Sequence, residues 1–133
     1  MLSLIPQILW LAPFTATILR IGVGISFIYA GYFLIVRRND LTKIRLPILG
    51  SPASWMLWIS GVITIFDGLA ILVGYGTQAA AIIGIIIVIK HMSLSKQYES
   101  LRPLPRSTYA LLFLMCLALL ISGAGPLGLD FPL

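Results

Sequence analysis

Long apolar runs with few charges dominate the pattern of hydrophobic and polar positions along this 133-residue chain. Four runs approach the roughly 20 apolar residues that a helix needs to cross a bilayer. They cover residues 14–36, 53–73, 77–92 and 107–123. The last two are shorter than average, which tilt or a locally thin bilayer would accommodate. The pattern predicts an all-α membrane protein, a four-transmembrane-helix bundle that forms a single domain over residues 1–133.

The segments between these runs differ in charge, and the difference predicts an orientation. Runs two and three are joined only by the uncharged turn Gly74-Tyr75-Gly76. The loops 37–52 and 90–106 together hold eight of the nine Lys and Arg residues. Four spans place both loops on one side, which the positive-inside rule makes cytoplasmic. We therefore expect a multi-pass protein of the cell membrane, N-out and C-out.

Composition supports a bilayer as the main solvent and excludes a nucleic-acid partner. The chain is 59% hydrophobic and 10% charged, with a mean hydropathy of +1.05. Its formal net charge is +5, but the basic residues lie in short segments between apolar runs. That placement is typical of membrane proteins rather than of a nucleic-acid-binding face. Membrane lipids are thus the expected partners, and the single Cys116 is expected to be a buried free thiol.

Two ionisable residues, Arg20 and Asp67, lie inside predicted spans. A charge at the centre of a span costs roughly 2.5 to 3.5 kcal/mol, so each should have a partner. Each lies about six residues, or roughly 9 Å at 1.5 Å per residue, from the outer end of its predicted helix. We expect a buried ion pair between them. It would be either a structural clamp or a functional site for binding or proton movement.

Other candidate residues are few. His91 ends the third span, and Tyr109 begins the fourth; both are expected near the cytoplasmic interface. The chain has no CxxC pair and no second His, so no metal site and no intrinsic cofactor is expected. Any redox role then needs a quinone or a partner subunit to carry the electrons. Tyr29 and Tyr32, at i and i+3 on one face, are candidates to hydrogen-bond a carbonyl ligand.

Glycines recur in the first two spans. They are Gly22, Gly24, Gly31, Gly61 and Gly68. Small residues let helices approach closely in lipid, where packing drives association. We interpret them as helix-packing positions, with space for a quinone ring as the alternative.

These residues resemble the DoxX family of four-helix membrane proteins. The first span carries Leu19 to Gly24 followed by Phe27 and Gly31, an arginine with a glycine eleven positions on. The second hairpin carries Gly61, Gly68, Leu72 and Gly74, then Thr77 and Ala79 to Ala81. The tail is the glycine-rich stretch Gly123 to Asp130. The resemblance extends over most of the chain, from Leu19 to Asp130.

The chain departs from the family at polar positions. Thr64 stands where many relatives have a glutamate, and Ala30 and Leu34 stand where they have a His and a Lys. Thr64 is therefore a candidate ligand-lining residue, and Asp67, nearly one turn away, a candidate for the missing carboxylate.

The resemblance implies a membrane subunit or anchor of a quinone-linked or thiol/sulfur redox assembly, not catalytic alone. At most, the chain would be one subunit of a quinone-linked oxidoreductase. Two alternatives stay open: a purely structural or assembly protein, and a small-solute transporter that acts as a homo-oligomer with Arg20 and Asp67 as its polar site.

Overall fold

The computed structural model describes residues 14–41, 43, 54–93 and 104–123, and these residues form five helices. They are α1 (Phe14–Val36), α2 (Arg38–Leu41), α3 (Ser54–Val73), α4 (Thr77–Met92) and α5 (Arg106–Ser122). The described part of the chain contains no strand, which confirms the all-α prediction. The four long helices begin and end within one residue of the predicted ranges. The short α2, which lies in the loop after α1, was not predicted. Most of both basic loops and the tail from residue 124 onward lie outside the described residues.

A glycine turn links α3 and α4, as the sequence predicted. Gly74 and Gly76 have φ angles of 77° and 58°, a left-handed region that side chains rarely adopt. The backbone N–H groups of Gly74 and Tyr75 both donate to the Ala70 carbonyl, at 2.9 and 3.2 Å. These two bonds satisfy a carbonyl at the end of α3 while the chain reverses.

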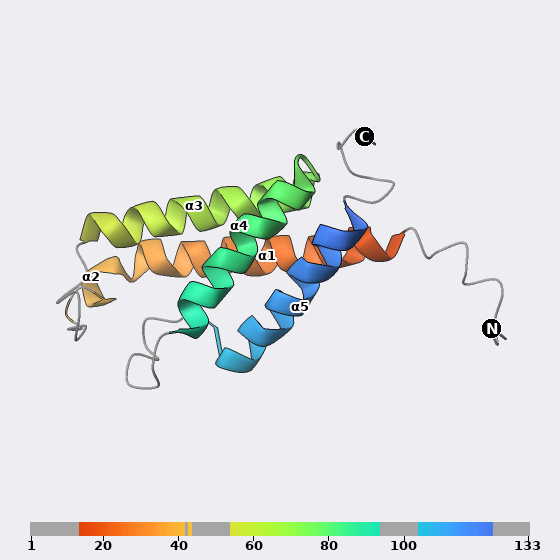
Figure 1. Ribbon diagram of the computed structural model, residues 1–133. Helices are drawn as coiled ribbons and strands as arrows, with labels where there is room; N and C mark the ends of the chain where they lie inside the picture. Colours follow the sequence, from red (N-terminus) through yellow and green to blue (C-terminus); the bar gives the residue numbers. More distant parts are fainter. Residues whose placement is uncertain (1–13, 42, 44–53, 94–103, 124–133) are drawn as a thin grey trace, which may run out of the picture.

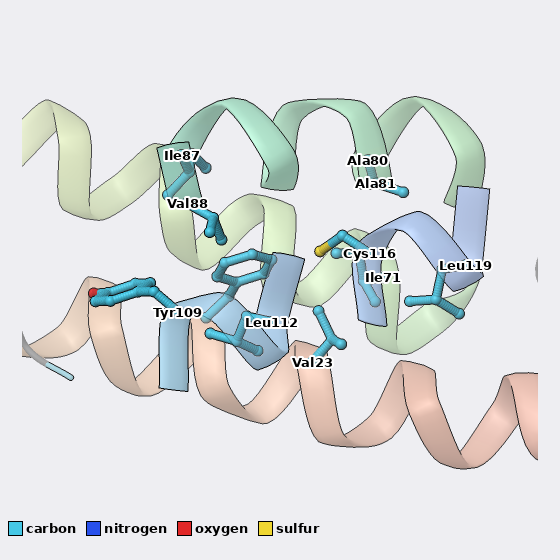
Figure 2. Packing of buried hydrophobic residues seen from close by; sticks show 11 residues of the cluster. Val23, Ile71, Ala80, Ala81, Ile87, Val88, Tyr109, Leu112, Cys116 and Leu119 are labelled. Atoms are coloured by element: carbon cyan, nitrogen blue, oxygen red, sulfur yellow. The ribbon is translucent and has the colours of Figure 1, made fainter. Parts of the chain in front are cut away.

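The four long helices pack as two pairs around one apolar core. α1 runs beside α3, and α4 runs beside α5 and crosses the first pair at an angle (Figure 1). All four contribute to the core cluster, most of which is labelled in Figure 2. Its members are Val23, Phe27, Ile71, Ala80, Ala81, Ile87, Val88, Tyr109, Leu112, Cys116 and Leu119.

Facing glycines let α1 and α3 approach closely at two positions along their contact. A Cβ built on Gly24 would lie 2.9 Å from the Gly68 carbonyl oxygen, and one on Gly68 would lie 2.8 Å from the Gly24 oxygen. Gly31 and Gly61 face each other in the same way, at 2.6 and 2.9 Å. Real Cβ atoms essentially never come so close to backbone, so these four positions need glycine in this packing of α1 on α3. Gly22 differs, because its Cβ would meet only the flexible end of Met115, at 3.4 Å.

The exterior of the helices is apolar. Large hydrophobic side chains are exposed on all four long helices, among them Ile18, Phe66, Ile86 and Leu114. By length and composition, α1 and α3 are each long and apolar enough to cross a membrane. α4 and α5 are shorter apolar helices.

Basic residues gather at one end of the helices, because α1 and α4 end there and α3 and α5 begin there. We call this the basic end and define it by the described residues Arg37, Arg38, Lys43, Lys90 and Arg106. The opposite end carries the turn between α3 and α4, and we call it the turn end.

Candidate functional site

Asp67 is the buried acidic residue of α3, and its carboxylate lies next to Gly84 of α4. Its neighbour Gly68 faces α1, so Asp67 lies one position round the helix, toward α4. Only 5% of its surface is exposed. Neither carboxylate oxygen has a hydrogen-bond partner within the described ranges. A buried polar group without a partner costs about 1 to 3 kcal/mol, more if charged, so this position calls for a role beyond packing.

Gly84 on α4 creates the space that Asp67 occupies. A Cβ built on Gly84 would lie 3.2 Å from Asp67 Oδ2 and 2.9 Å from Phe27 Cε2 of α1. Cys116 of α5 also lies close enough for electrostatic interaction with the carboxylate. Three other helices thus approach Asp67, and any side chain larger than hydrogen at position 84 would displace it or the Phe27 ring.

A groove between α3 and α4 leads to Asp67 from the surface. It lies toward the turn end and has a volume of about 500 Å³. We call it the turn-end groove. Its lining is Val62, Ile63, Phe66, Asp67, Ala70, Tyr75, Gly76, Ala79, Ala80 and Ile83. Asp67 is the only ionisable group in this lining apart from the Tyr75 phenol, so the groove is an apolar site with one carboxyl at its base.

The predicted ion pair between Arg20 and Asp67 is absent. Both side chains are buried, Arg20 being 4% exposed, but Asp67 makes no ion pair or hydrogen bond with it. The prediction assumed that α1 and α3 end level with each other. In the register set by the facing glycines, Arg20 lies level with Leu72 instead. Arg20 therefore sits five residues, or about 7.5 Å at 1.5 Å per residue, nearer the turn end than Asp67.

The other predicted ligand-lining residues do not reach the turn-end groove. Tyr29 and Tyr32 lie on the outer surface of α1, 52% and 61% exposed. Thr64 is buried, and its hydroxyl donates to the Ser60 carbonyl of its own helix at 2.8 Å. Thr64 lines a second, smaller groove nearer the basic end. Thr64 and Asp67 thus border neighbouring spaces rather than a common one.

His91 and Tyr109 lie at the basic end but are buried in the protein, whereas His91 was expected to be exposed to water. His91 is 3% exposed, and its Nδ1 lies 2.8 Å from the Ile87 carbonyl oxygen. Its ring stacks on Tyr109 with centroids 5.2 Å apart and an angle of 11° between the planes. The pair joins α4 to α5 at the basic end, where Figure 2 shows Tyr109 within the core. Both stacked rings are covered by protein. Cys116 is a buried free thiol, as expected.

Sequence reasoning missed Gly84, which decides the shape of the site. A signal was present, because Gly84 interrupts a run of large apolar residues from Ile82 to Ile89. Within the described residues, no three His, Cys, Asp or Glu side chains come together as metal ligands.

Comparison with known proteins supports the family resemblance. A model of the DoxX family matches residues 15–94, which span α1 to the end of α4 and amount to more than half of the chain. Comparison with curated proteins and with solved structures yields no match. The matched region contains the four facing glycines, Asp67 and Gly84, and therefore the whole candidate site on α3 and α4. On this evidence of sequence and fold, the chain belongs to the DoxX family of membrane proteins.

Proposed function

We propose that this DoxX protein binds a quinone in the turn-end groove, with the head group at Asp67, and acts as the membrane subunit of a quinone-linked redox assembly. The observation that carries the proposal is the buried, unpartnered Asp67 carboxyl at the base of an apolar groove of about 500 Å³. That volume falls within the range of small-molecule sites, which are mostly apolar with a few placed polar groups. The groove opens on the apolar exterior, from which a lipid-soluble ligand would enter.

A quinone suits this site because both its redox forms can use a carboxyl group. A protonated carboxyl donates a hydrogen bond to a quinone carbonyl, and an ionised one accepts a hydrogen bond from a quinol hydroxyl. Either bond would satisfy the buried oxygens of Asp67 and recover the cost of leaving them unpaired. Phe66, Tyr75 and Ile83 supply apolar and aromatic surface for the ring.

The proposed assembly needs a partner subunit to supply electrons. Such a subunit would oxidise two thiols to a disulfide, which releases two electrons and two protons. The quinone would take up two electrons and two protons to form quinol, so the sum is balanced. This chain would contribute binding and orientation of the quinone, and Asp67 would hold a proton beside the carbonyl oxygen. Family membership supports the membrane setting of this proposal.

The orientation belongs to the same proposal. All four long helices span the membrane, and the basic end lies in the cytoplasm, as the positive-inside rule favours. The turn-end groove would then open toward the outer half of the bilayer. The electron-donating partner would dock at the turn end.

Quinone binding to the purified protein in lipid nanodiscs tests the proposal. We expect saturable binding of a short-chain ubiquinone, measured as quenching of tryptophan and tyrosine fluorescence. Asp67→Leu should weaken it at least tenfold, or about 1.4 kcal/mol. Ala79→Trp should also weaken it, because Ala79 lines the groove and a tryptophan side chain there would fill part of it. Leu111→Trp, on the exposed face of α5, is the matched control and should bind like the natural protein.

Three outcomes would contradict the proposal. Equal binding by Ala79→Trp and Leu111→Trp would place any quinone outside the groove. No saturable quinone binding, with a more stable Asp67→Leu variant, would favour a purely structural protein. Saturable binding of a polar solute that Asp67→Leu abolishes would favour the small-solute transporter, for which an oligomeric state above the monomer would be needed.

A further inference from the structure

The second groove lies between α3 and α4 at the basic end and has a volume of about 200 Å³. We call it the basic-end groove. Its apolar wall includes Trp55, Met56 and Ile59, and its polar residues are Ser60, Thr64 and Lys90. The exposed Trp55 stands near the start of α3, where tryptophan side chains commonly meet lipid head groups.

Lys90 brings a positive charge into this groove, and no carboxylate among the described residues forms an ion pair with it. Its Nζ donates to the Ser60 hydroxyl at 2.8 Å. The ion pair of Lys43 with Asp40, at 3.9 Å, lies elsewhere, in the loop after α1. An ammonium group has three donors, so the hydroxyl of Ser60 leaves room for an anionic acceptor.

The Lys90 ammonium lies below the end of α3, where a charge without a counter-ion is costly. Ser60 lies six residues along α3 from Ser54, or about 9 Å at 1.5 Å per residue. The ammonium is therefore held below the helix end, where an unbalanced charge is costly. In addition, α4 has 16 residues and is about 24 Å long, shorter than a typical hydrocarbon core of about 30 Å. A short helix draws lipid head groups inward, which would bring a phosphate toward Lys90.

Two arginines at this end already have contacts that involve their charged groups. Arg37 lies over the Phe33 ring, with its Cζ 5.2 Å from the centroid. Arg106 donates from Nη2 to the Met92 carbonyl at 3.1 Å. Lys90 combines three features that these arginines do not share: an apolar groove beside it, a neighbouring hydroxyl, and a depth within reach of an acyl chain.

We propose that the basic-end groove is a binding site for one anionic phospholipid. The lipid phosphate lies on Lys90 and Ser60, Trp55 sits at head-group level, and one acyl chain follows the wall formed by Met56, Ile59 and Ile63. A cation beside an apolar groove at a membrane surface matches a ligand with an anionic head and an apolar chain. This site is distinct from the Asp67 site and does not depend on quinone binding.

Thermal unfolding of the delipidated full chain in neutral detergent tests the site. We expect phosphatidylglycerol to raise the unfolding midpoint saturably, and phosphatidylcholine or inorganic phosphate to have little effect. Lys90→Gln should lower the apparent phosphatidylglycerol affinity by about fivefold to tenfold, the range expected for one basic residue at an anionic membrane surface. Lys90→Arg keeps the charge and should retain most of the affinity. Lys43→Gln removes a charge from the same end outside the groove and is the matched control.

Photolabelling of the natural protein provides a test that does not depend on a variant folding. Phosphatidylglycerol with a diazirine in its acyl chain should attach within residues 54–63 of α3 or at the end of α4. Equal loss of affinity in Lys90→Gln and Lys43→Gln would show diffuse attraction to the basic end and overturn the proposal. If inorganic phosphate raised the unfolding midpoint as much as the lipid does, the groove would be a site for soluble anions and the lipid proposal would be wrong. Equal effects of the two lipids, or labelling spread over all four helices, would also overturn it.

Discussion

Replacing Gly24 and Gly22 by alanine compares two glycines that lie two residues apart in α1 and face different surroundings. At position 24 the new methyl carbon would lie 2.9 Å from the Gly68 carbonyl oxygen and 2.7 Å from Leu72 Cγ. At position 22 it would lie 3.4 Å from the flexible end of Met115. The first contact requires α1 and α3 to move apart, whereas the second requires at most a small side-chain shift.

The magnitude follows from two opposing effects. Alanine is favoured over glycine inside a helix by about 1 kcal/mol, and both variants gain this. Overpacking costs about 1 to 3 kcal/mol, and only Gly24→Ala incurs it. The backbone at Gly68 cannot turn away as a side chain can, so the cost should lie in the upper part of that range. We expect Gly24→Ala to lower the free energy of unfolding by about 1 to 2 kcal/mol and Gly22→Ala to leave it unchanged or raise it.

Unfolding of both variants by sodium dodecyl sulfate, followed by far-UV circular dichroism in mixed micelles, measures this difference. Gly68→Ala and the double variant Gly24→Ala/Gly68→Ala complete the comparison. The double variant should lose less than the two single losses combined, because both methyl groups strain one contact. Equal stability of Gly22→Ala and Gly24→Ala would show that Gly24 faces lipid, and would refute the register from which the depth of Asp67 is derived.

Three further predictions concern topology, the buried charges and the aromatic stack. In a background without the native cysteine, Lys43→Cys should resist a membrane-impermeant thiol reagent in intact cells, while Gln78→Cys should react; the reverse labelling would invert the proposed orientation. The effects of Arg20→Gln and Asp67→Asn on unfolding should add within about 0.5 kcal/mol, because the two side chains share no contact, and a larger coupling would restore the direct ion pair. Tyr109→Ala should cost about 3 kcal/mol or more in the same assay, since it empties a fully buried ring position, and a loss below about 1 kcal/mol would place the ring at the surface.

Local sequence patterns predicted the helices well, but they predicted poorly how far α1 and α3 are shifted relative to each other along their axes. Apolar runs and the Gly74 to Gly76 turn depend on neighbouring residues, so each is readable along the chain. The relative height of α1 and α3 depends on which glycines meet, and Gly24 can face any of several positions on α3 until the whole interface is packed. Assuming level helix ends therefore displaced Arg20 from its true height by about one and a half turns.

The burial of His91 could not be predicted from the sequence for a similar reason. A histidine near a helix end beside Lys90 is typical of an interface, and only the partner on α5 decides otherwise. Tyr109 lies 18 positions further along the chain, and α5 must pack on α4 before the two rings stack. Gly84 likewise looks like an ordinary small residue until Phe27 and Asp67 are seen to converge on it.

The two grooves follow from a single packing asymmetry. Glycines let α1 pack closely against α3, whereas α4 crosses that pair at an angle (Figure 1). Helices that cross at an angle diverge along their length, and apolar side chains fill the space between them only in part. The groove toward the turn end holds a carboxyl, and the groove toward the basic end holds an amine. Ile63 lines both grooves, so a ligand at Asp67 and a lipid at Lys90 would both contact the Ile63 side chain. Ile63→Ala would then alter the affinity of both occupants, which no change confined to either polar group would do.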